Sequence, residues 1–330
     1  MRIRPSVVPA LAATALLLTA CGTVHPGAGN TGPAAPSSST GVGDPGKDGV
    51  RITSLTLPGD SPAPTAGRSS SGDDDAGGSS GLSVDDPTKD SGVAATFEVT
   101  NSGTQSLTYT VVVSFLSSDG GAMGSGTATV RDVGPGRTVS GSVRAGYLPL
   151  STPRTTGAKV LEVRKVPAGE APTAPGVCPA SGIRVSADDG DAAMGLRIVG
   201  LHLDNCGAHD YTVDGYPLLE LLDGDLKTVH GITILQGGGG ITTGTGPDEK
   251  PRRITLKPGE SAISSLVWRN TTEAGTAVNV PYVRVRAKAG AGPVTVTPNL
   301  DLGTTGQLGV KAWARAKPAG AGAGRPGTRG

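Results

Sequence analysis

The sequence contains few aromatic residues and has no excess of charge of either sign. Two Phe, two Trp and five Tyr stand among 330 residues. Because small-molecule pockets are commonly lined by aromatic side chains, this scarcity argues against a protein that captures sugars. The 29 basic and 28 acidic residues leave a net charge of +1, so no strong field attracts a nucleic acid. The sequence therefore predicts no nucleic-acid partner.

Motifs for catalysis, cofactors and metals are also missing. The segment QGGGGITTGTG, residues 236–246, resembles a phosphate-cradling loop, but it contains no lysine and no helix follows it, so we expect a mobile hairpin loop. Asp188, Asp189 and Asp191 lie close together without the spaced acceptors and the distal Glu of an EF-hand. The sequence therefore predicts no catalytic residue, no cofactor and no metal site. Calcium at the three aspartates stays open as an alternative.

Cysteine is rare, and the first of the three cysteines follows an apolar run. Arg2 and Arg4 precede the apolar residues 7–18, which are too few to span a bilayer, so residues 1–21 predict a secretory signal peptide. The tetrapeptide Leu-Thr-Ala-Cys that ends at Cys21 resembles the bacterial lipobox. This resemblance implies that Cys21 is lipidated and becomes the N-terminus, anchored at the extracytoplasmic face of the cell membrane. An ordinary signal peptide with a chance cysteine is the alternative.

Low-complexity segments separate the parts of the chain that can fold. Residues 22–48 are rich in Gly, Pro and Ser and have almost no large apolar side chains, so they cannot offset the entropy of ordering and predict a disordered tether. The same composition predicts a disordered insert at about 60–90, a non-helical linker at 167–177 and a disordered tail at 316–330.

The region 49–166 has the pattern of a small β-sandwich. Tyr109, Val111, Val113 and Phe115 recur at every second position, which is typical of a half-buried strand. Short apolar runs alternate with Asp-Gly and Pro-Gly turn signals. The stretch FEVTNSGTQSLTYTVVVSFLSSDGG, followed by VGPGRT, resembles the FxLYD-like and immunoglobulin-like modules of bacterial surface proteins. The region 49–166 contains no cysteine, so we expect its stability to come from side-chain packing alone.

The region 178–315 predicts a second, larger sandwich. Nine short strand-like runs are separated by Gly, Asn-Thr or Pro-Gly signals. In YVRVRA, Val283 and Val285 point to one face, while Tyr282, Arg284 and Arg286 point to the other, which predicts a sheet with one buried and one wet face. The fold class is therefore all-β, with two immunoglobulin-like sandwiches behind the signal peptide and tether.

The two remaining cysteines, Cys178 and Cys206, belong to this second region. Two cysteines of one domain most often pair in an oxidising compartment, and a bridge across 28 residues contributes roughly 3–4 kcal/mol. A metal held by this pair together with His202 or His209 is the alternative, although thiolate sites usually have three or four closely spaced ligands. The sequence favours the disulfide.

Several landmarks of the second region occur in a fixed order. Asn205-Cys206 precedes Gly-Tyr-Pro at Tyr216, and a Pro-Gly turn at 258–259 then leads into a run that contains Trp268. This order resembles domain of unknown function 4232, common in secreted and lipid-anchored actinobacterial proteins. The resemblance implies a secreted β-sandwich and no particular reaction. Tyr216 and Trp268 are candidates for structural positions or, alternatively, for the walls of a binding groove.

Two kinds of function are compatible with these observations. We expect a membrane-anchored lipoprotein whose sandwiches act as a non-catalytic interaction module for a cell-envelope protein or a wall polymer. The alternative is a lipoprotein that binds a solute or a metal with its C-terminal domain. A hydrolase would need a nucleophile and a base that meet only in the fold. A concave site with convergent polar groups would favour the solute-binding protein or the hydrolase, and two plain sandwich faces would favour the interaction module.

Overall fold

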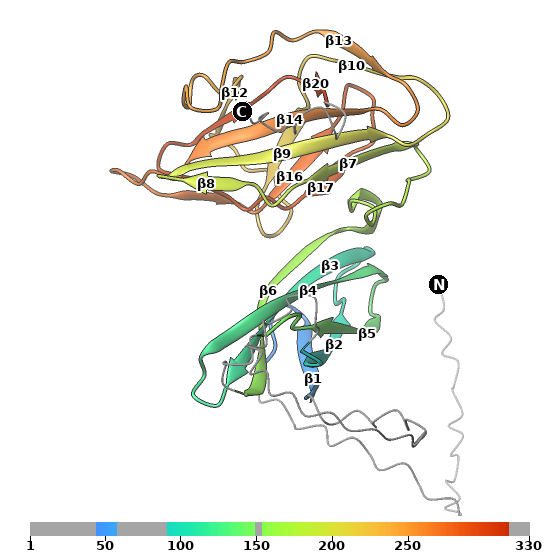
Figure 1. Ribbon diagram of the computed structural model, residues 1–330, viewed down its shortest axis with the longest axis vertical. Helices are drawn as coiled ribbons and strands as arrows, with labels where there is room; N and C mark the ends of the chain where they lie inside the picture. The colour runs from blue at the N-terminus through green and yellow to red at the C-terminus, as the bar shows by residue number, and fades with distance from the viewer. Residues whose placement is uncertain (1–43, 58–90, 149–153, 317–330) are drawn as a thin grey trace, which may run out of the picture. The chain divides into compact units, whose positions relative to one another are not determined.

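The computed structural model describes residues 44–57, 91–148 and 154–316, which all fall within one compact unit of the chain (Figure 1). The predictions for the signal peptide, Cys21, most of the tether, the insert at 60–90 and nearly all of the tail lie outside these residues. Within them, no helix is long and apolar enough to cross a membrane. Residues 44–48, assigned above to the tether, are described, and Asp44 accepts a hydrogen bond from the backbone N–H of Val160 at 3.2 Å.

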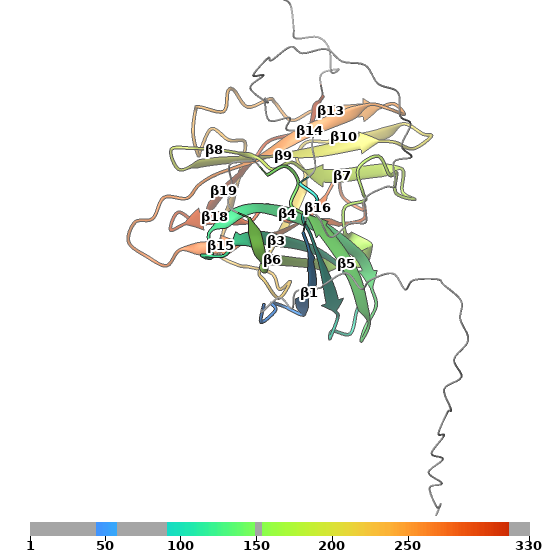
Figure 2. The ribbon, with the colours of Figure 1, turned by 60° about the horizontal axis from the view of Figure 1, so that its bottom comes forward.

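The N-terminal sandwich consists of two antiparallel sheets of three strands each. One sheet has the order β1-β2-β5 and the other the order β4-β3-β6, and Figure 2 shows both. The strands are β1 (Val50–Thr56), β2 (Ala94–Thr100), β3 (Leu107–Ser117), β4 (Ala122–Val133), β5 (Thr138–Arg144) and β6 (Thr155–Pro167). Tyr109, Val111, Val113 and Phe115 of β3 are all buried in the core between the sheets, as the alternation predicts.

The C-terminal sandwich has more and shorter strands. The large sheet has the order β12-β19-β14-β9-β7, with β20 paired to β14 and β8 to β9; the smaller sheets are β11-β16-β17, β10-β13 and β15-β18. The strands are β7 (Ile183–Ala187), β8 (Asp191–Ala193), β9 (Leu196–Asn205), β10 (Tyr211–Asp214), β11 (Leu218–Leu222), β12 (Thr233–Gln236), β13 (Arg253–Leu256), β14 (Ser261–Arg269), β15 (Val278–Val280), β16 (Tyr282–Arg286), β17 (Val294–Val296), β18 (Leu300–Gly303), β19 (Gln307–Val310) and β20 (Ala314–Arg315). Its core is built mainly from Leu and Val, with Trp268 and Trp313.

The face of β16 that was expected to be wet is covered at one end. Val283 and Val285 are buried, as predicted, but Tyr282 on the opposite face is only 4% exposed. It packs with Val166 and Leu222, and its hydroxyl accepts a hydrogen bond from the backbone N–H of Lys165 at 3.2 Å. The expectation for Tyr282 is therefore wrong, because the end of β6 lies against this part of the sheet.

The linker contains a helical turn that the sequence did not predict. Residues Ala168–Glu170 form the 3-10 helix η1. The Glu170 carboxylate accepts hydrogen bonds from Arg284 at 2.8 Å and from the Thr295 hydroxyl at 2.7 Å. Arg284 also donates to Glu220 at 2.8 Å. These bonds to β11, β16 and β17 hold the start of the linker in place and explain why a Pro/Gly-rich segment adopts a turn here.

A buried asparagine joins three loops at one end of the N-terminal sandwich. Asn101 follows β2 and is completely buried. Its side-chain amide donates to the carbonyls of Val133 at 2.7 Å and Gln105 at 2.8 Å, and its side-chain oxygen accepts from the N–H of Gly103 at 2.9 Å. All polar atoms of this side chain are therefore satisfied, as burial of an amide requires.

The C-terminal sandwich has the same arrangement. Asn205 ends β9 and is 1% exposed. Its amide donates to the carbonyls of Leu256 at 2.9 Å and His209 at 2.8 Å, and its oxygen accepts from the N–H of Gly207 at 3.2 Å. We call Asn101 and Asn205, each with these three hydrogen bonds, the asparagine clamps.

Each clamp is also hydrogen-bonded to a Pro-Gly turn through its backbone. In the turn at residues 134–137, the N–H of Gly136 donates to the carbonyl of Asn101 at 2.8 Å. In the turn at residues 257–260, the N–H of Gly259 donates to the carbonyl of Asn205 at 2.7 Å. Both glycines have positive φ angles, 66° and 83°, which a type II turn needs at its third position. The strands around the clamps pair alike, since β1-β2-β5 corresponds to β7-β9-β14. The two sandwiches therefore share one structural repeat.

Candidate functional site

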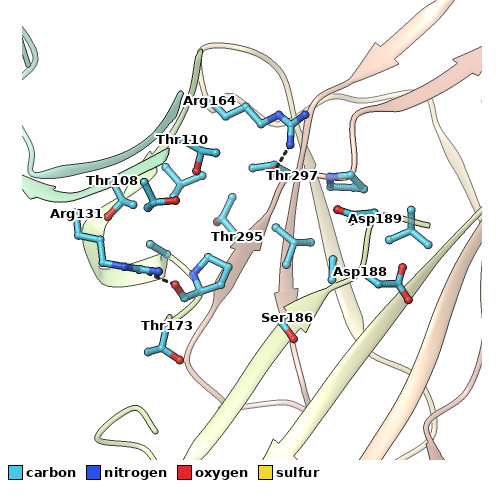
Figure 3. Close-up of a pocket in the computed structure, with 18 residues that line it drawn as sticks. Thr108, Thr110, Arg131, Arg164, Thr173, Ser186, Asp188, Asp189, Thr295 and Thr297 are labelled. Carbon is cyan, nitrogen blue, oxygen red and sulfur yellow. Dashed lines mark hydrogen bonds between the residues drawn. The ribbon is translucent and has the colours of Figure 1, made fainter. Parts of the chain in front are cut away.

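The candidate site is a cavity of about 330 Å³, drawn in Figure 3. One wall is the outer face of β3, β4 and β6. The other wall comes from β7, the residues that follow it, and the end of β17, and the linker residues 171–173 close the cavity between them. Hydroxyl and charged side chains dominate this lining; those labelled in Figure 3 are Thr108, Thr110, Arg131, Arg164, Thr173, Ser186, Asp188, Asp189, Thr295 and Thr297.

Strand alternation places the polar side chains of the first wall. Because Tyr109 and Val111 point into the core, Thr110 between them points to the outer face. Thr110 lies opposite Thr129 of β4 and opposite Arg164 of β6 in the antiparallel register. Cross-strand neighbours share a face of the sheet, so these three side chains face the cavity together.

The two arginines of this wall are held in different ways. Arg164 donates twice to Glu162, at 2.7 and 2.9 Å, and once to the Thr297 hydroxyl at 3.4 Å. The hydrogen bonds with Glu162 raise the pKa of Arg164 and lower the pKa of Glu162, although partial burial opposes both shifts. Arg131 donates to the carbonyl of Pro172 at 2.8 Å and has no carboxylate partner among the described residues. Its guanidinium is thus positioned without being neutralised.

The two aspartates of the second wall also differ. The Asp188 carboxylate accepts from the N–H groups of Gly190 at 3.0 Å and Gly200 at 2.8 Å, and it lies 3.2 Å from Nε2 of His202. The Asp188 carboxylate therefore connects the turn after β7 to β9 through these hydrogen bonds. Asp189 extends towards the cavity in Figure 3 and has no hydrogen-bond or ion-pair partner in the part of the chain that the structure describes.

The calcium alternative gains no support from these contacts. A cation at the Asp188 carboxylate would have to displace the two backbone N–H groups that donate to it. No group of three or more His, Cys, Asp or Glu side chains suited to a metal ion occurs among the described residues.

Cys178 and Cys206 form a disulfide, with an S–S distance of 2.01 Å and a Cα–Cα distance of 5.8 Å. It lies next to the second asparagine clamp, where the N–H of Cys206 donates to the carbonyl of Gly182 at 3.0 Å. His202, the metal ligand considered as an alternative, contacts Asp188 instead. The structure therefore agrees with the disulfide that the sequence favours.

Tyr216 and Trp268 do not line the cavity of Figure 3. Trp268 is 2% exposed, and its indole N–H donates to Asp301 at 2.7 Å. Tyr216 is partly buried and packs against the core of the C-terminal sandwich. Both side chains make structural contacts, Trp268 also borders a second cavity beside Asp191 and Arg197, and neither forms a groove at the cavity of Figure 3.

The glycine-rich loop at 236–246 binds an anion from its own chain. The N–H groups of Gly238 and Gly239 donate to the two carboxylate oxygens of Asp248 at 2.8 and 2.9 Å. Two successive N–H groups that converge on an anion form a backbone nest. The lysine that the segment itself lacks is supplied by Lys311, whose ammonium lies 4.0 Å from Asp248 and donates to the carbonyl of Thr245 at 2.7 Å. The loop is therefore tied down at several points.

Replacing Asp248 with Asn should loosen this loop. The N–H groups of Gly238 and Gly239 lose a charged acceptor, so we expect their amide protons to exchange with solvent roughly tenfold faster. Hydrogen exchange followed by NMR measures this directly. Asp225→Asn is the matched control, because Asp225 is exposed and its carboxylate contacts Lys227 at 3.6 Å, away from the glycine-rich loop. Unchanged exchange in D248N would contradict the nest.

The same contact should depend on pH. The N–H of Gly238 is the main cause that lowers the pKa of Asp248 below its ordinary value of 3.8, with Gly239 and Lys311 acting in the same direction against desolvation. A carboxyl whose pKa is lowered by folding stabilises the folded loop above its ordinary pKa and ceases to do so as the pH falls through the lowered value. Protection of the two glycine amides should therefore persist above about pH 4 and decline below it.

Sequence reasoning missed the cavity, and of its lining residues it singled out only Asp188 and Asp189, as a calcium alternative. The lining comes from separate segments between Thr108 and Pro298, and no local pattern connects them. The available signal was the alternation of Thr108 and Thr110 with buried residues in β3, which marks an outer face rich in hydroxyls. Asp189 stood out only as one of three clustered aspartates, and Arg131 gave no signal that distinguishes it from a solvated surface charge.

Residues 178–319 match the family model described as Domain of unknown function (DUF4232), which confirms the resemblance predicted for the C-terminal half. The match begins at Cys178 and covers the disulfide, the second clamp and the second wall of the cavity. No curated protein matches the chain.

Proposed function

We propose that this protein is a membrane-anchored extracytoplasmic lipoprotein whose two sandwiches form a non-catalytic binding module of the cell envelope. The observation that carries the anchoring is the tetrapeptide ending at Cys21, directly after an apolar segment and directly before a Gly/Pro/Ser-rich stretch. The disulfide supports an oxidising location, because such bonds persist mainly outside the cytoplasm. The membrane is then the first partner, contacted through lipid on Cys21.

The cavity supports binding as the activity. Its convergent hydroxyls and charges form a concave polar site, which a solute-binding module predicts and two plain sandwich faces would not provide. This observation also favours the second candidate, a solute-binding lipoprotein, although the walls come from both sandwiches and not from the C-terminal domain alone. A protein or polymer of the envelope remains the expected partner of the outer surfaces. The balanced net charge of +1 supports the exclusion of nucleic acid.

Metabolic labelling with an alkyne-bearing palmitate tests the anchor. We expect the wild-type chain to take up label and to sediment with membranes, and Cys21→Ala to lose both properties, because the acyl chains supply the membrane affinity. The double variant Cys178→Ala/Cys206→Ala is the control and should keep its label. Label on the C21A variant, or an unlabelled wild-type chain in the soluble fraction, would refute the proposal.

A further inference from the structure

Two of the four charged side chains in the cavity are held by hydrogen bonds to neighbouring side chains or backbone N–H groups. Arg164 is paired with Glu162, and Asp188 with His202 and two backbone N–H groups. Arg131 on the first wall and Asp189 on the second have no ion-pair partner within 4 Å among the described residues, although the charge of Asp189 contributes to raising the pKa of Arg164. The cavity therefore offers one available cation and one available carboxylate on opposite walls (Figure 3).

The available cation is also oriented. The hydrogen bond from one terminal nitrogen of Arg131 to the carbonyl of Pro172 holds the guanidinium beside the linker at the edge of the cavity. A guanidinium has five N–H donors, so four stay available, and a carboxylate is the anion that matches their geometry. Asp189, an acceptor only, suits an ammonium group.

The hydroxyls between these two charges suit a polar molecule. Thr110, Thr129 and Ser186 line the cavity, and a hydroxyl can both donate to a carbonyl and accept from an N–H. A volume of about 330 Å³ lies at the lower end of the range for small-molecule sites. The space therefore fits a molecule longer than a single inorganic ion.

We propose that this cavity binds a small zwitterion of dipeptide size, with its carboxylate at Arg131 and its ammonium at Asp189. This inference rests on the proposed function as a binding module and names the class of ligand. A sugar is disfavoured because no aromatic side chain lines the cavity. A phosphate would meet the carboxylate of Asp189, and among the described residues of the lining a divalent cation would find one carboxylate without a hydrogen-bond partner.

Calorimetric titration of the full-length lipidated chain in detergent with the dipeptide alanyl-alanine tests the proposal. We expect saturable binding that weakens at least about tenfold in Arg131→Gln and in Asp189→Asn, because each variant removes one charge-assisted contact. Both positions are exposed, so the fold should be unaffected. Arg137→Gln and Asp225→Asn, exposed residues outside the cavity, are matched controls and should bind as the wild type does.

Capped dipeptides assign each contact. Alanyl-alanine with an amidated C-terminus should bind the wild type as weakly as uncapped alanyl-alanine binds R131Q, and it should bind R131Q no more weakly than it binds the wild type. N-acetylated alanyl-alanine should behave in the same way with D189N. Equal binding of capped and uncapped forms overturns the proposal. So does preferential binding of inorganic phosphate or Ca²⁺, or no saturable binding at millimolar concentration. Labelling of Cys21 is independent of these results, so failure here and failure of the lipoprotein proposal are distinguishable.

Discussion

Loss of the Cys178–Cys206 disulfide is expected to lower the melting temperature of the C-terminal sandwich by roughly 10 °C. The bridge closes a loop with a sequence separation of 28, and loop-closure entropy assigns it about 3–4 kcal/mol. It also lies beside the second clamp, so its removal frees the residues before β7 as well as the end of β9. Differential scanning calorimetry with and without reductant measures the effect.

The N-terminal sandwich is an internal control for this experiment, because it contains no cysteine. The double variant Cys178→Ala/Cys206→Ala should melt like the reduced wild type and should not respond to reductant. Hydrogen exchange assigns each transition to its sandwich. Equal shifts in both sandwiches, or none in the C-terminal one, would show that the bridge does not stabilise the fold in this way.

The second large effect is expected at the asparagine clamps. Asn205→Ala leaves the carbonyls of Leu256 and His209 and the N–H of Gly207 without their partner. An unsatisfied buried polar group costs about 1–3 kcal/mol, so we expect a loss of about 3 kcal/mol or more in the free energy of unfolding of the C-terminal sandwich. Asn101→Ala should destabilise the N-terminal sandwich to a similar extent. Urea unfolding of each variant provides the measurement.

The exposed Asn279 supplies the matched control, and Asn279→Ala should leave stability unchanged within about 0.5 kcal/mol. Asn205→Asp separates hydrogen bonding from size, because it keeps the acceptor for Gly207 but turns a carboxylate towards two carbonyls. We expect it to be at least as destabilising as Asn205→Ala. A stable N205D variant would mean that the two donated hydrogen bonds contribute little.

The sequence predicted the fold class, the general location of the strands and the C-terminal family because each of these depends on local pattern. Alternation in β3 marked Tyr109, Val111, Val113 and Phe115 as core, and they are buried. The ordered landmarks around Cys206 and Trp268 identified the family whose model matches residues 178–319. Tyr282 shows the limit of such reasoning, because its burial comes from Val166, a residue more than a hundred positions away.

The site was beyond sequence reasoning for the same reason. Lys311 reaches the glycine-rich loop from the last part of the described chain, so the segment at 236–246 looked incomplete when read alone. Arg131 and Asp189 become a pair of opposed charges only when β4 and the turn after β7 face one cavity. The clamps, in contrast, left a readable trace, since Asn-Ser-Gly and Asn-Cys-Gly are each followed by a Pro-Gly turn.

The two asparagine clamps also set an order of events in folding. The first links positions 32 residues apart, and the second links positions 51 residues apart. The entropic free-energy cost of closing the longer loop is higher by only about 0.4 kcal/mol. Contacts of longer range nevertheless slow the search for the native pairing. The disulfide between Cys178 and Cys206 lies beside the second clamp, and its formation by oxidation takes seconds to hours. In a chain that emerges N-terminus first, the half that needs no oxidant is complete before the half that does.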